Sequence, residues 1–593
     1  MPTYEAPLRD VRFLLEKVFH YETVIGTLDG YEEVGLDVVL AVLDSAATFV
    51  QGTVLPINLP GDNIGCLFEE GAVTTPPGYK RAYRLYREAG WSALAADPEY
   101  GGQGLPASLG LIVREFVASG SMSFGMYAGL SQGAYRALLA HGSEELKQTY
   151  LPRLAAGEWA GTMCMTEAEG GSDLSQLRTR AIPVADGSYQ VSGTKIFISG
   201  GDHDLTENIV HLVLARLPDA PEGTRGLSLF VVPKYLPGTG AGNGVACGSV
   251  EHKMGIRASA TAVLHFEEAQ GWLLGKENGG MQAMFTMMNS SRIGVAVQSL
   301  GAAEISFQNA LSYAKERCQG RTPDAAKSEP GPSHIIGHPD VRIALLKMKA
   351  LVEGSRALYI ESALALDIKA RHPDQAEREL AEGRLALLTP VLKSFISDCA
   401  LEVTYLGIQV FGGHGYVHEN GMEHLYRDAR IVPLYEGTNA IQALDLVHRK
   451  IGLDDGRVLQ AYLNGLETLV SEGRHHAALD TMAGALAAAL ALLRHASTRL
   501  RTLGAGGVQV EVGAAASDYL RLFGLVAMGG AWLRMARAAH DTLQAGSDAT
   551  DFLQGKIKTA DFYFQRVLPE TEQLHRRITT GATSIMAIKT EEF

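Results

Sequence analysis

Several classes of protein are excluded by what this sequence lacks. It has five cysteines among 593 residues and no C-x-x-C pair, so we predict reduced, structural cysteines rather than a disulfide framework, and no metal site. Its most apolar stretch, Met482–Leu493, is about 12 residues long, whereas a membrane-spanning helix needs about 20. Its opening residues, MPTYEAPLRD, carry charges where a secretory or transit peptide has an apolar or acid-poor run. We therefore expect a cytoplasmic protein with no membrane span.

An excess of positive charge is also missing. The formal net charge is −14, which repels nucleic acid and equally repels an anionic ligand such as a coenzyme A ester. Such a ligand would need local arginines and backbone donors, because the bulk charge does not attract it. No nucleic-acid partner is predicted. Apolar residues (46%) and charged residues (20%) are present in ordinary globular proportions, so large buried cores are expected.

The length of the chain predicts several domains, because single hydrophobic cores stop growing at about 250–300 residues. Apolar residues at helical spacing predict a helical domain over residues 1–160. Short β-rich runs bounded by Gly, Asp and Pro predict a middle β-domain over 161–278. Long amphipathic segments return over 279–455, interrupted by a loop at 320–340, and Ala-rich helices predict an additional helical domain over 456–593. The fold class is mainly α with a central β-domain.

Two segments of the middle region have residue types suited to a polar, planar ligand. In Met163–Asp173 (MCMTEAEGGSD), small residues and hydroxyl groups permit close backbone approach and hydrogen bonding. A Gly-rich connection between two domains is the alternative interpretation. In Gly193–Gly201, Phe197 and Ser199 point to one face of a strand and could address one ligand together. A core Phe beside a strand-end Ser is the alternative there.

Two further segments lie in the helical region that follows. The Gly-rich break in Gln409–Tyr416 (QVFGGHGY) offers backbone to a phosphate or an adenine edge. In the segment YEGT that follows, Glu436 could sit in an apolar pocket with a raised pKa and act as a general base; a charge that complements a helix dipole is the alternative. Arg292 and Arg317, near the two ends of one long helix, have the planar fork that suits phosphates and carboxylates, although each could be a solvated helix residue.

Taken together and in this order, the four segments resemble the acyl-CoA dehydrogenase family over roughly residues 30–450. The resemblance implies a helical domain, a β-barrel-like domain and a four-helix-bundle domain, here followed by a C-terminal helical domain. It implies that FAD is held by Met163, Met165, Thr166, Ser172, Phe197, Ser199, Arg317, Gln319, Gln409, Gly412, Gly413 and Thr438. Of these, Gln409, Gly412 and Gly413 would reach FAD from the neighbouring subunit. It implies that the acyl-CoA is bordered by Ser172, Asn289, Arg292 and Gly437.

Two positions depart from the family pattern. Phe197 stands where Trp is common, which keeps an aromatic face for the flavin. The pair Gln319-Gly320 replaces the hydroxyl and Phe usual after the pyrophosphate-binding Arg, which weakens the assignment of Arg317 and Gln319. Some relatives place the base one position before Arg292, but that residue is Ser291 here, so the resemblance favours Glu436.

The resemblance also implies a reaction. Glu436 would remove the α-proton of a fatty acyl-CoA, medium to long chains being favoured, while FAD takes the β-hydride to give the trans-2-enoyl-CoA. Electron-transferring flavoprotein would then reoxidise the flavin. The C-terminal extension is typical of a longer subgroup of homodimers that includes 3-methylthiopropionyl-CoA dehydrogenases. An acyl-CoA oxidase, a DNA-binding relative and a catalytically silent acyl-CoA-binding protein remain as alternatives.

Overall fold

The computed structural model describes residues 2–323 and 331–593. The chain forms two compact units, one made of Met1–Ser45 and Val295–Phe593 and the other of Ala46–Gly294. The predicted loop at 320–340 falls partly on residues 324–330, which lie outside the described residues. Two helices, α3 (Leu36–Phe49) and α9 (Gly280–Glu316), carry the chain from one unit to the other.

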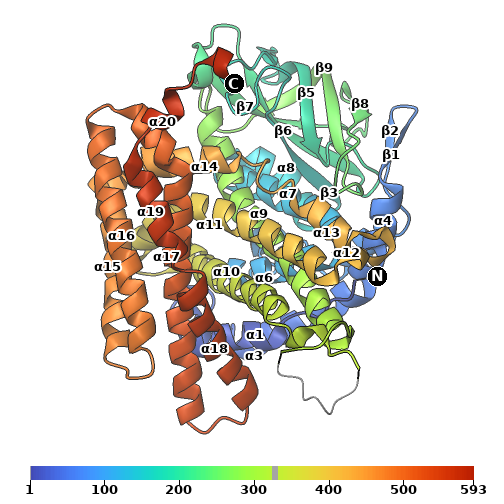
Figure 1. Ribbon diagram of the computed structural model, residues 1–593. Coiled ribbons are helices and arrows are strands. Elements are labelled where there is room, and N and C mark those ends of the chain that lie inside the picture. The colour runs from blue at the N-terminus through green and yellow to red at the C-terminus, as the bar shows by residue number, and fades with distance from the viewer. Residues whose placement is uncertain (1, 324–330) are drawn as a thin grey trace. The chain divides into compact units, whose positions relative to one another are not determined.

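The unit Ala46–Gly294 begins with helices and ends with a sheet (Figure 1). Side chains cap the free N–H groups at the start of two of its helices; Ser121 accepts from Phe124 N at the start of α7, and Ser143 accepts from Leu146 N at the start of α8. The helical segments are η2 (Val50–Val54), η3 (Leu55–Ile57), α4 (Asn58–Ile64), α5 (Tyr79–Glu88), η4 (Pro98–Tyr100), α6 (Ala107–Gly120), α7 (Met122–His141), α8 (Glu144–Ala155) and η5 (Gly223–Gly226).

The central β-domain is a seven-stranded sheet. Its strands are β3 (Trp159–Cys164), β4 (Arg180–Pro183), β5 (Tyr189–Ser199), β6 (Asn208–Arg216), β7 (Leu227–Pro233), β8 (Val245–Val250) and β9 (Thr261–Leu273). The pairings β6–β4, β4–β5, β5–β9, β9–β7 and β7–β6 close a ring of five strands, which confirms the barrel-like expectation. Strand β7 is buried throughout and β6 nearly so, because both of their faces pack against apolar side chains.

Sequence patterns identified β-rich runs at 189–191, 195–198, 209–214, 227–232 and 262–266 but not the other strands, and the first two runs belong to one strand, β5. The hairpin of β1 (Leu67–Glu69) and β2 (Ala72–Thr74) lies in the segment predicted to be helical. Its strands are too short to show an alternating pattern. Strand β3 contains Met163 and Cys164, so the first two residues of the predicted Gly-rich segment are extended and paired with β6.

The other unit is helical. Its N-terminal part contains α1 (Leu8–Phe13), η1 (Leu14–Val18), α2 (Tyr21–Ile25) and the start of α3. Its bundle consists of α9 from Val295, η6 (Ile335–Gly337), α10 (Pro339–Arg371), α11 (Gln375–Phe411), α12 (Gly413–Tyr416), η7 (His418–Asn420), α13 (Met422–Ala429), α14 (Asn439–Asp445), η8 (Leu446–Lys450) and η9 (Leu453–Gly456). The predicted additional helices are α15 (Arg457–Arg474), α16 (Asp480–Ala505), α17 (Gln509–Gln544), α18 (Thr550–Arg566), α19 (Glu570–Thr580), α20 (Thr583–Met586) and η10 (Thr590–Glu592), drawn orange to red in Figure 1.

Buried contacts join these additional helices to the bundle. The fully buried Trp532 of α17 donates its indole N–H to Ala350 O of α10 at 3.1 Å. Gly524 of α17 lies so close to Phe395 of α11 that a Cβ atom there would be 2.3 Å from the ring. Close packing of this kind over a fully buried Trp makes the C-terminal helices part of one hydrophobic core with α10 and α11.

A buried ionic network extends this core to the N-terminus. Arg356 pairs with Asp10 at 2.6 Å and with Glu304, while Lys556 of α18 pairs with Asp10 and, at 2.9 Å, with Glu353. Arg356 and Lys556 are almost completely buried, so each needs its carboxylate partners to offset the loss of water. Burial alone would raise the pKa of Asp10, but Lys556 and Arg356 outweigh it and lower that pKa to about 2.

One helical stretch of the described residues, Leu36–Ile64, is long and apolar enough to cross a membrane by length and composition. It is distinct from Met482–Leu493, which lies in α16. A single stretch of this kind is weak evidence for a membrane span.

Candidate active site

The structure brings together the predicted flavin residues of β3 and β5. Beyond the end of β3, Thr166 O accepts from Ile196 N of β5 at 2.9 Å, which sets Met165 and Thr166 beside Phe197. The Phe197 side chain is 60% exposed although it belongs to a strand with a hydrophobic inner face. Its backbone is left-handed (φ +58°), at an irregularity in the β5–β9 pairing. An aromatic face turned outward by a β-bulge, next to a hydroxyl group, fits a planar ring system.

A buried ion pair that the sequence analysis did not identify fixes this edge. Lys195 is fully buried and donates to Met165 O at 3.0 Å and to Glu167 Oε1 at 2.8 Å. Glu167 also accepts from the backbone N–H and the hydroxyl of Thr179. Although burial favours the neutral acid, Lys195 and these donors hold the pKa of Glu167 below its usual value. Since Met165 and Glu167 flank Thr166, the pair fixes the predicted flavin segment to β5.

The other predicted residues of this unit lie in two places. Ser172 is exposed in the loop that follows the Glu167–Gly170 bridge, and Ser199 is half-buried at the end of β5. Asn289 is exposed on the first part of α9, whereas Arg292, one turn later, is buried. Near them His141 bonds Thr286 at 2.7 Å, so this part of α9 is packed against α7.

Glu436 lies in a loop just before α14, not in the first turn of that helix. The N-cap of α14 is Thr438, whose hydroxyl accepts from Ile441 N at 3.3 Å. The helix end is therefore capped without Glu436, which disfavours the helix-dipole interpretation of this carboxylate. Glu436 and Gly437 are both left-handed, with φ of +57° and +81°. For Glu436 this conformation costs of order 1–3 kcal/mol and persists only where surrounding contacts enforce it.

Two side chains supply those contacts. Lys393 of α11 is fully buried and donates to Gly437 O at 2.8 Å and to Asn439 Oδ1 at 2.9 Å. Gln442, also fully buried, donates to Glu436 O at 3.0 Å and more weakly to Gly437 O at 3.5 Å. We call Lys393, Gln442 and Asn439 the loop clamp. It holds both left-handed residues by their carbonyl groups.

Asn439 connects the clamp to the body of α11. Its amide donates to Asp398 Oδ1 at 2.7 Å and to Ser397 Oγ at 2.9 Å. Burial raises the pKa of Asp398, which this amide and nearby cations oppose. The sequence analysis did not identify Lys393, because a single lysine in a helical run is usually exposed to solvent.

The predicted pyrophosphate and adenine residues gather at one end of the bundle. Tyr313, one turn before Arg317, stacks on Phe411 with centroids 4.2 Å apart and bonds His414 Nδ1 at 2.8 Å. Those two residues bracket Gly412 and Gly413, and Gln409 precedes them on α11. Side chains of Arg317, Gln319 and Gln409 are exposed. The two segments thus lie side by side in the fold, a point that their separation in the sequence did not reveal.

Comparison with known proteins identifies the family. Residues 40–158, 162–269 and 278–451 match the models described as acyl-CoA dehydrogenase N-terminal, middle and C-terminal domains, and 461–589 match one described as acetyl-CoA dehydrogenase C-terminal like. The chain is 44% identical over 589 residues to a 3-methylmercaptopropionyl-CoA dehydrogenase of Ruegeria pomeroyi, covering 98% of this chain and 99% of that one.

A second relative and a solved structure agree. The chain is 33% identical over 614 residues to the broad-specificity linear acyl-CoA dehydrogenase FadE5 of Mycobacterium tuberculosis, covering 100% of both. The fold matches that of an acyl-CoA dehydrogenase from Bacillus anthracis complexed with FAD, with a TM-score of 0.72, 21% identity and coverage of 96% of this chain and 91% of that one. This chain belongs to the acyl-CoA dehydrogenase family of FAD-dependent oxidoreductases.

Proposed function

We propose that the protein oxidises an acyl-CoA thioester to the trans-2-enoyl-CoA, with Glu436 as the base that removes the α-proton. The observation that carries this proposal is the loop clamp, which holds Glu436 in a left-handed conformation that costs free energy. A carboxylate held in this way is typical of a functional site, since a surface glutamate has no need of it. Lys393 and Gln442 orient the loop through its carbonyl groups, and the Glu436 carboxylate would accept the proton.

The residues that would hold FAD fit the group. Met165, Thr166 and the exposed Phe197 provide an apolar and hydroxyl-bearing edge for the isoalloxazine ring, and Arg317 provides a cation for the pyrophosphate. When bound, FAD supplies the acceptor for the β-hydride. If Gln409, Gly412 and Gly413 reach the cofactor of a neighbouring subunit, as the family resemblance implies, then Arg317 reaches it with them, because Tyr313 joins the two segments.

For the substrate, the comparisons favour 3-methylmercaptopropionyl-CoA over the medium to long fatty acyl chains expected from sequence. The relative with that activity is 44% identical over nearly the whole of both chains, whereas the broad-specificity linear enzyme is 33% identical. A pocket that distinguishes acyl chains does so by about 1–3 kcal/mol per methylene. Anaerobic bleaching of the flavin by 3-methylmercaptopropionyl-CoA and by C4, C8 and C16 acyl-CoA esters tests this. Faster bleaching by the C16 ester than by the sulfur-containing ester would overturn it.

A homodimer and electron-transferring flavoprotein are the partners we propose. Tyr405, Tyr416 and Val417, beside Gln409 on the same end of the bundle, expose large apolar surface, and Tyr416 is 85% exposed. A second copy that covers this surface would also bring Gln409 to its cofactor. The oxidase alternative predicts peroxide formation in air that electron-transferring flavoprotein does not suppress.

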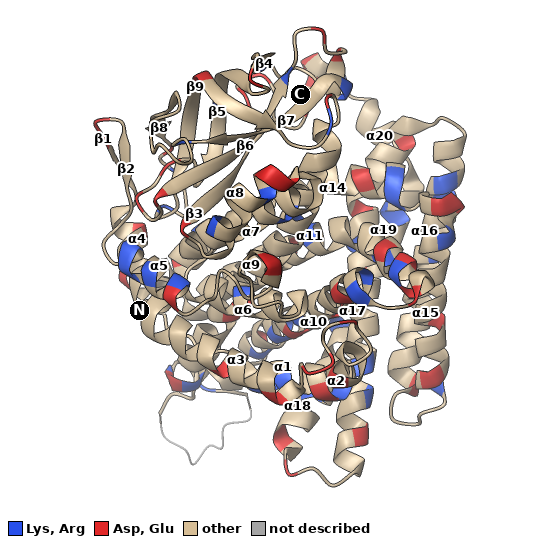
Figure 2. Cartoon of the chain, turned by 180° about the vertical axis from the view of Figure 1, so that it is seen from behind, with Lys and Arg blue, Asp and Glu red and all other residues tan. Residues whose placement is uncertain are grey.

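A DNA-binding role has little support. Basic and acidic residues both occur on α15, α16 and α19 (Figure 2), and the chain carries a net charge of −14. Affinity for DNA phosphates requires a basic face.

The Glu436→Gln variant tests the base and excludes the silent acyl-CoA-binding alternative. We expect it to retain FAD and its yellow colour, because Glu436 does not belong to the predicted flavin contacts, but to lose flavin reduction by acyl-CoA at least about 1000-fold. Stopped-flow absorbance under anaerobic conditions measures this. Near-normal reduction would place the base elsewhere, and a wild-type protein that binds acyl-CoA without reducing its flavin would support the silent alternative.

A further inference from the structure

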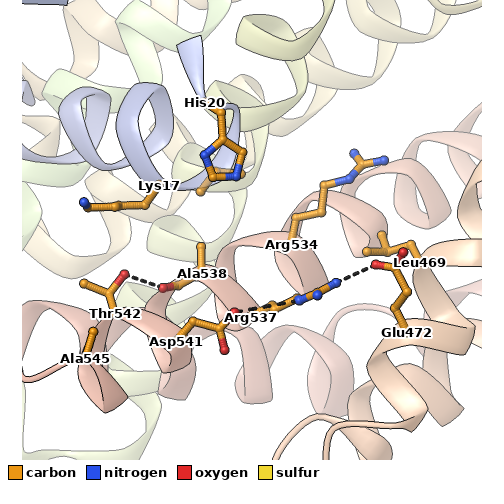
Figure 3. A pocket seen from close by; sticks show the side chains of 11 residues that line it. Lys17, His20, Leu469, Glu472, Arg534, Arg537, Ala538, Asp541, Thr542 and Ala545 are labelled. Atoms are coloured by element: carbon orange, nitrogen blue, oxygen red, sulfur yellow. Dashed lines mark hydrogen bonds and ion pairs between the residues drawn. The ribbon is translucent and has the colours of Figure 1, made fainter. Parts of the chain in front are cut away.

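A pocket of about 600 Å³ lies among the C-terminal helices and the N-terminal segment, remote in sequence from every predicted site residue. Figure 3 shows Asp541 and Arg537 of α17 on one wall, with Glu472 of α15 beside them. Arg537 Nη1 bonds Glu472 Oε2 at 2.5 Å, and Arg537 Nε lies 3.8 Å from Asp541 Oδ2. The second oxygen of Asp541 therefore faces the arginine.

The first oxygen of Asp541 faces His476, which in turn contacts His540. His476 Nε2, from the connection between α15 and α16, lies 3.6 Å from Asp541 Oδ1. The rings of His476 and His540 meet edge to face with centroids 4.5 Å apart. One potential ligand atom from each of His476, His540 and Asp541 can be chosen so that all three lie within 4.8 Å of one another. The Nδ1 atoms of both rings are buried and have no hydrogen-bond partner among the described residues.

We propose that His476, His540 and Asp541 bind a divalent transition-metal ion, with Zn²⁺ as the ion to test. Two imidazoles and one carboxylate, with a position open to solvent, form a set that Zn²⁺ accepts. Bonds of about 2.0–2.2 Å to tetrahedral Zn²⁺ place ligand atoms about 3.4 Å apart. The 3.6 Å separation of His476 and Asp541 is already close to that value, and half-buried rings can turn to close the rest.

The surroundings support a metal at this place in two ways. Arg537 lies on the Asp541 oxygen that does not face the histidines, so it orients the carboxylate from outside, as the outer partners of metal ligands do. Its positive charge is offset by Glu472, and that of Arg534, on the same wall, by Glu361 at 2.5 Å. The bound ion would connect the α15–α16 loop to α17 and so stabilise this part of the C-terminal domain.

A second histidine pair provides a matched control. His495 Nδ1 and His575 Nε2 lie 2.8 Å apart on α16 and α19, so these rings already bond each other. No carboxylate joins them in a ligand group within the described residues. Zn²⁺ that binds histidines without selectivity would bind this pair as well.

The test uses the FAD-containing protein after treatment with a chelator, titrated calorimetrically with Zn²⁺, and Co²⁺ absorption as a second readout. We expect about one ion per chain and a higher melting temperature with Zn²⁺. His476→Gln and His540→Gln should each weaken binding at least about tenfold, while His495→Gln should leave it unchanged. Equal binding by the wild type and the His476→Gln/His540→Gln double variant would overturn the proposal. Loss of binding in His495→Gln, or no binding by a wild type that is folded and contains FAD, would overturn it as well.

Discussion

Replacing Lys393 by methionine isolates what the loop clamp contributes to the reaction. The variant keeps the length and the buried apolar stem of the side chain but removes both hydrogen bonds, to Gly437 O and Asn439 Oδ1. Hydrogen bonds from a charged donor contribute about 1.5–3 kcal/mol each. That is comparable with the cost of order 1–3 kcal/mol of the left-handed Glu436. Without Lys393, Gln442 remains to oppose relaxation of the loop.

The expected consequence is a displaced base rather than a lost cofactor. A displacement of about 1 Å at a reacting group costs about 100-fold in rate, so kcat should fall about 100-fold. The KM for acyl-CoA should change by less than about threefold, because Lys393 contacts the predicted substrate residue Gly437 at its backbone carbonyl group. FAD content should remain that of the wild type. Steady-state kinetics with electron-transferring flavoprotein, together with the flavin spectrum, measures all three quantities.

Lys556→Met is the matched control for this experiment. Lys556 is also a fully buried lysine of the same unit, but its partners are Asp10 and Glu353, not the loop. It should lower the melting temperature at least as much as Lys393→Met while its kcat per folded protein stays near that of the wild type. A normal kcat in Lys393→Met, or an equal loss in Lys556→Met, would refute the reasoning. Normal reduction by Glu436→Gln would instead refute the assignment of the base, because the clamp would then position a residue that removes no proton.

Two further predictions concern stability. Asp10→Asn removes one carboxylate from two buried cations and should destabilise the protein by about 3 kcal/mol at pH 7. Because the pKa of Asp10 falls from 3.8 to about 2 on folding, the stabilisation by this carboxylate is complete above about pH 4 and is lost as the pH falls toward 2. The melting curves of variant and wild type should therefore converge near pH 2, and a difference that stays constant with pH would contradict this. Gly524→Ala should lower the free energy of unfolding by about 1–3 kcal/mol, because its Cβ would lie 2.3 Å from the Phe395 ring. Gly555→Ala in α18, where a Cβ would meet nothing within 4 Å, should raise it by up to about 1 kcal/mol. Urea unfolding measures both, and equal effects of the two substitutions would show that α17 does not pack as described.

The sequence predicted the order of helical and β regions and the segments around Thr166, Phe197, Gln409 and Glu436, because these features are local. Strand runs, Gly-rich breaks and the YEGT segment can each be read within about ten residues. The contacts that hold them could not be read in this way. Lys195 is one example, since a buried lysine and an exposed one look alike until the fold shows which carboxylate lies beside it.

Long-range pairing was equally hidden. The ion pair of Asp10 and Lys556 joins residues 546 positions apart, and no periodicity relates them. The short hairpin at residues 67–74 was missed for the opposite reason, because three-residue strands are too brief to reveal alternation. The conformation of Glu436 was also out of reach, since a positive φ at a non-glycine residue depends on contacts from Lys393 and Gln442.

The pairing of Asp10 with Lys556 has a consequence for synthesis of the chain. The unit Ala46–Gly294 is continuous, so it can fold while the ribosome is still adding later residues. Residues Met1–Ser45 belong to the other unit and must wait until α18 has emerged, when Lys556 can reach Asp10. During that interval the apolar side chains of α1 and η1 have no core to enter. The N-terminal segment is therefore the part of the nascent chain that we expect to depend most on chaperones.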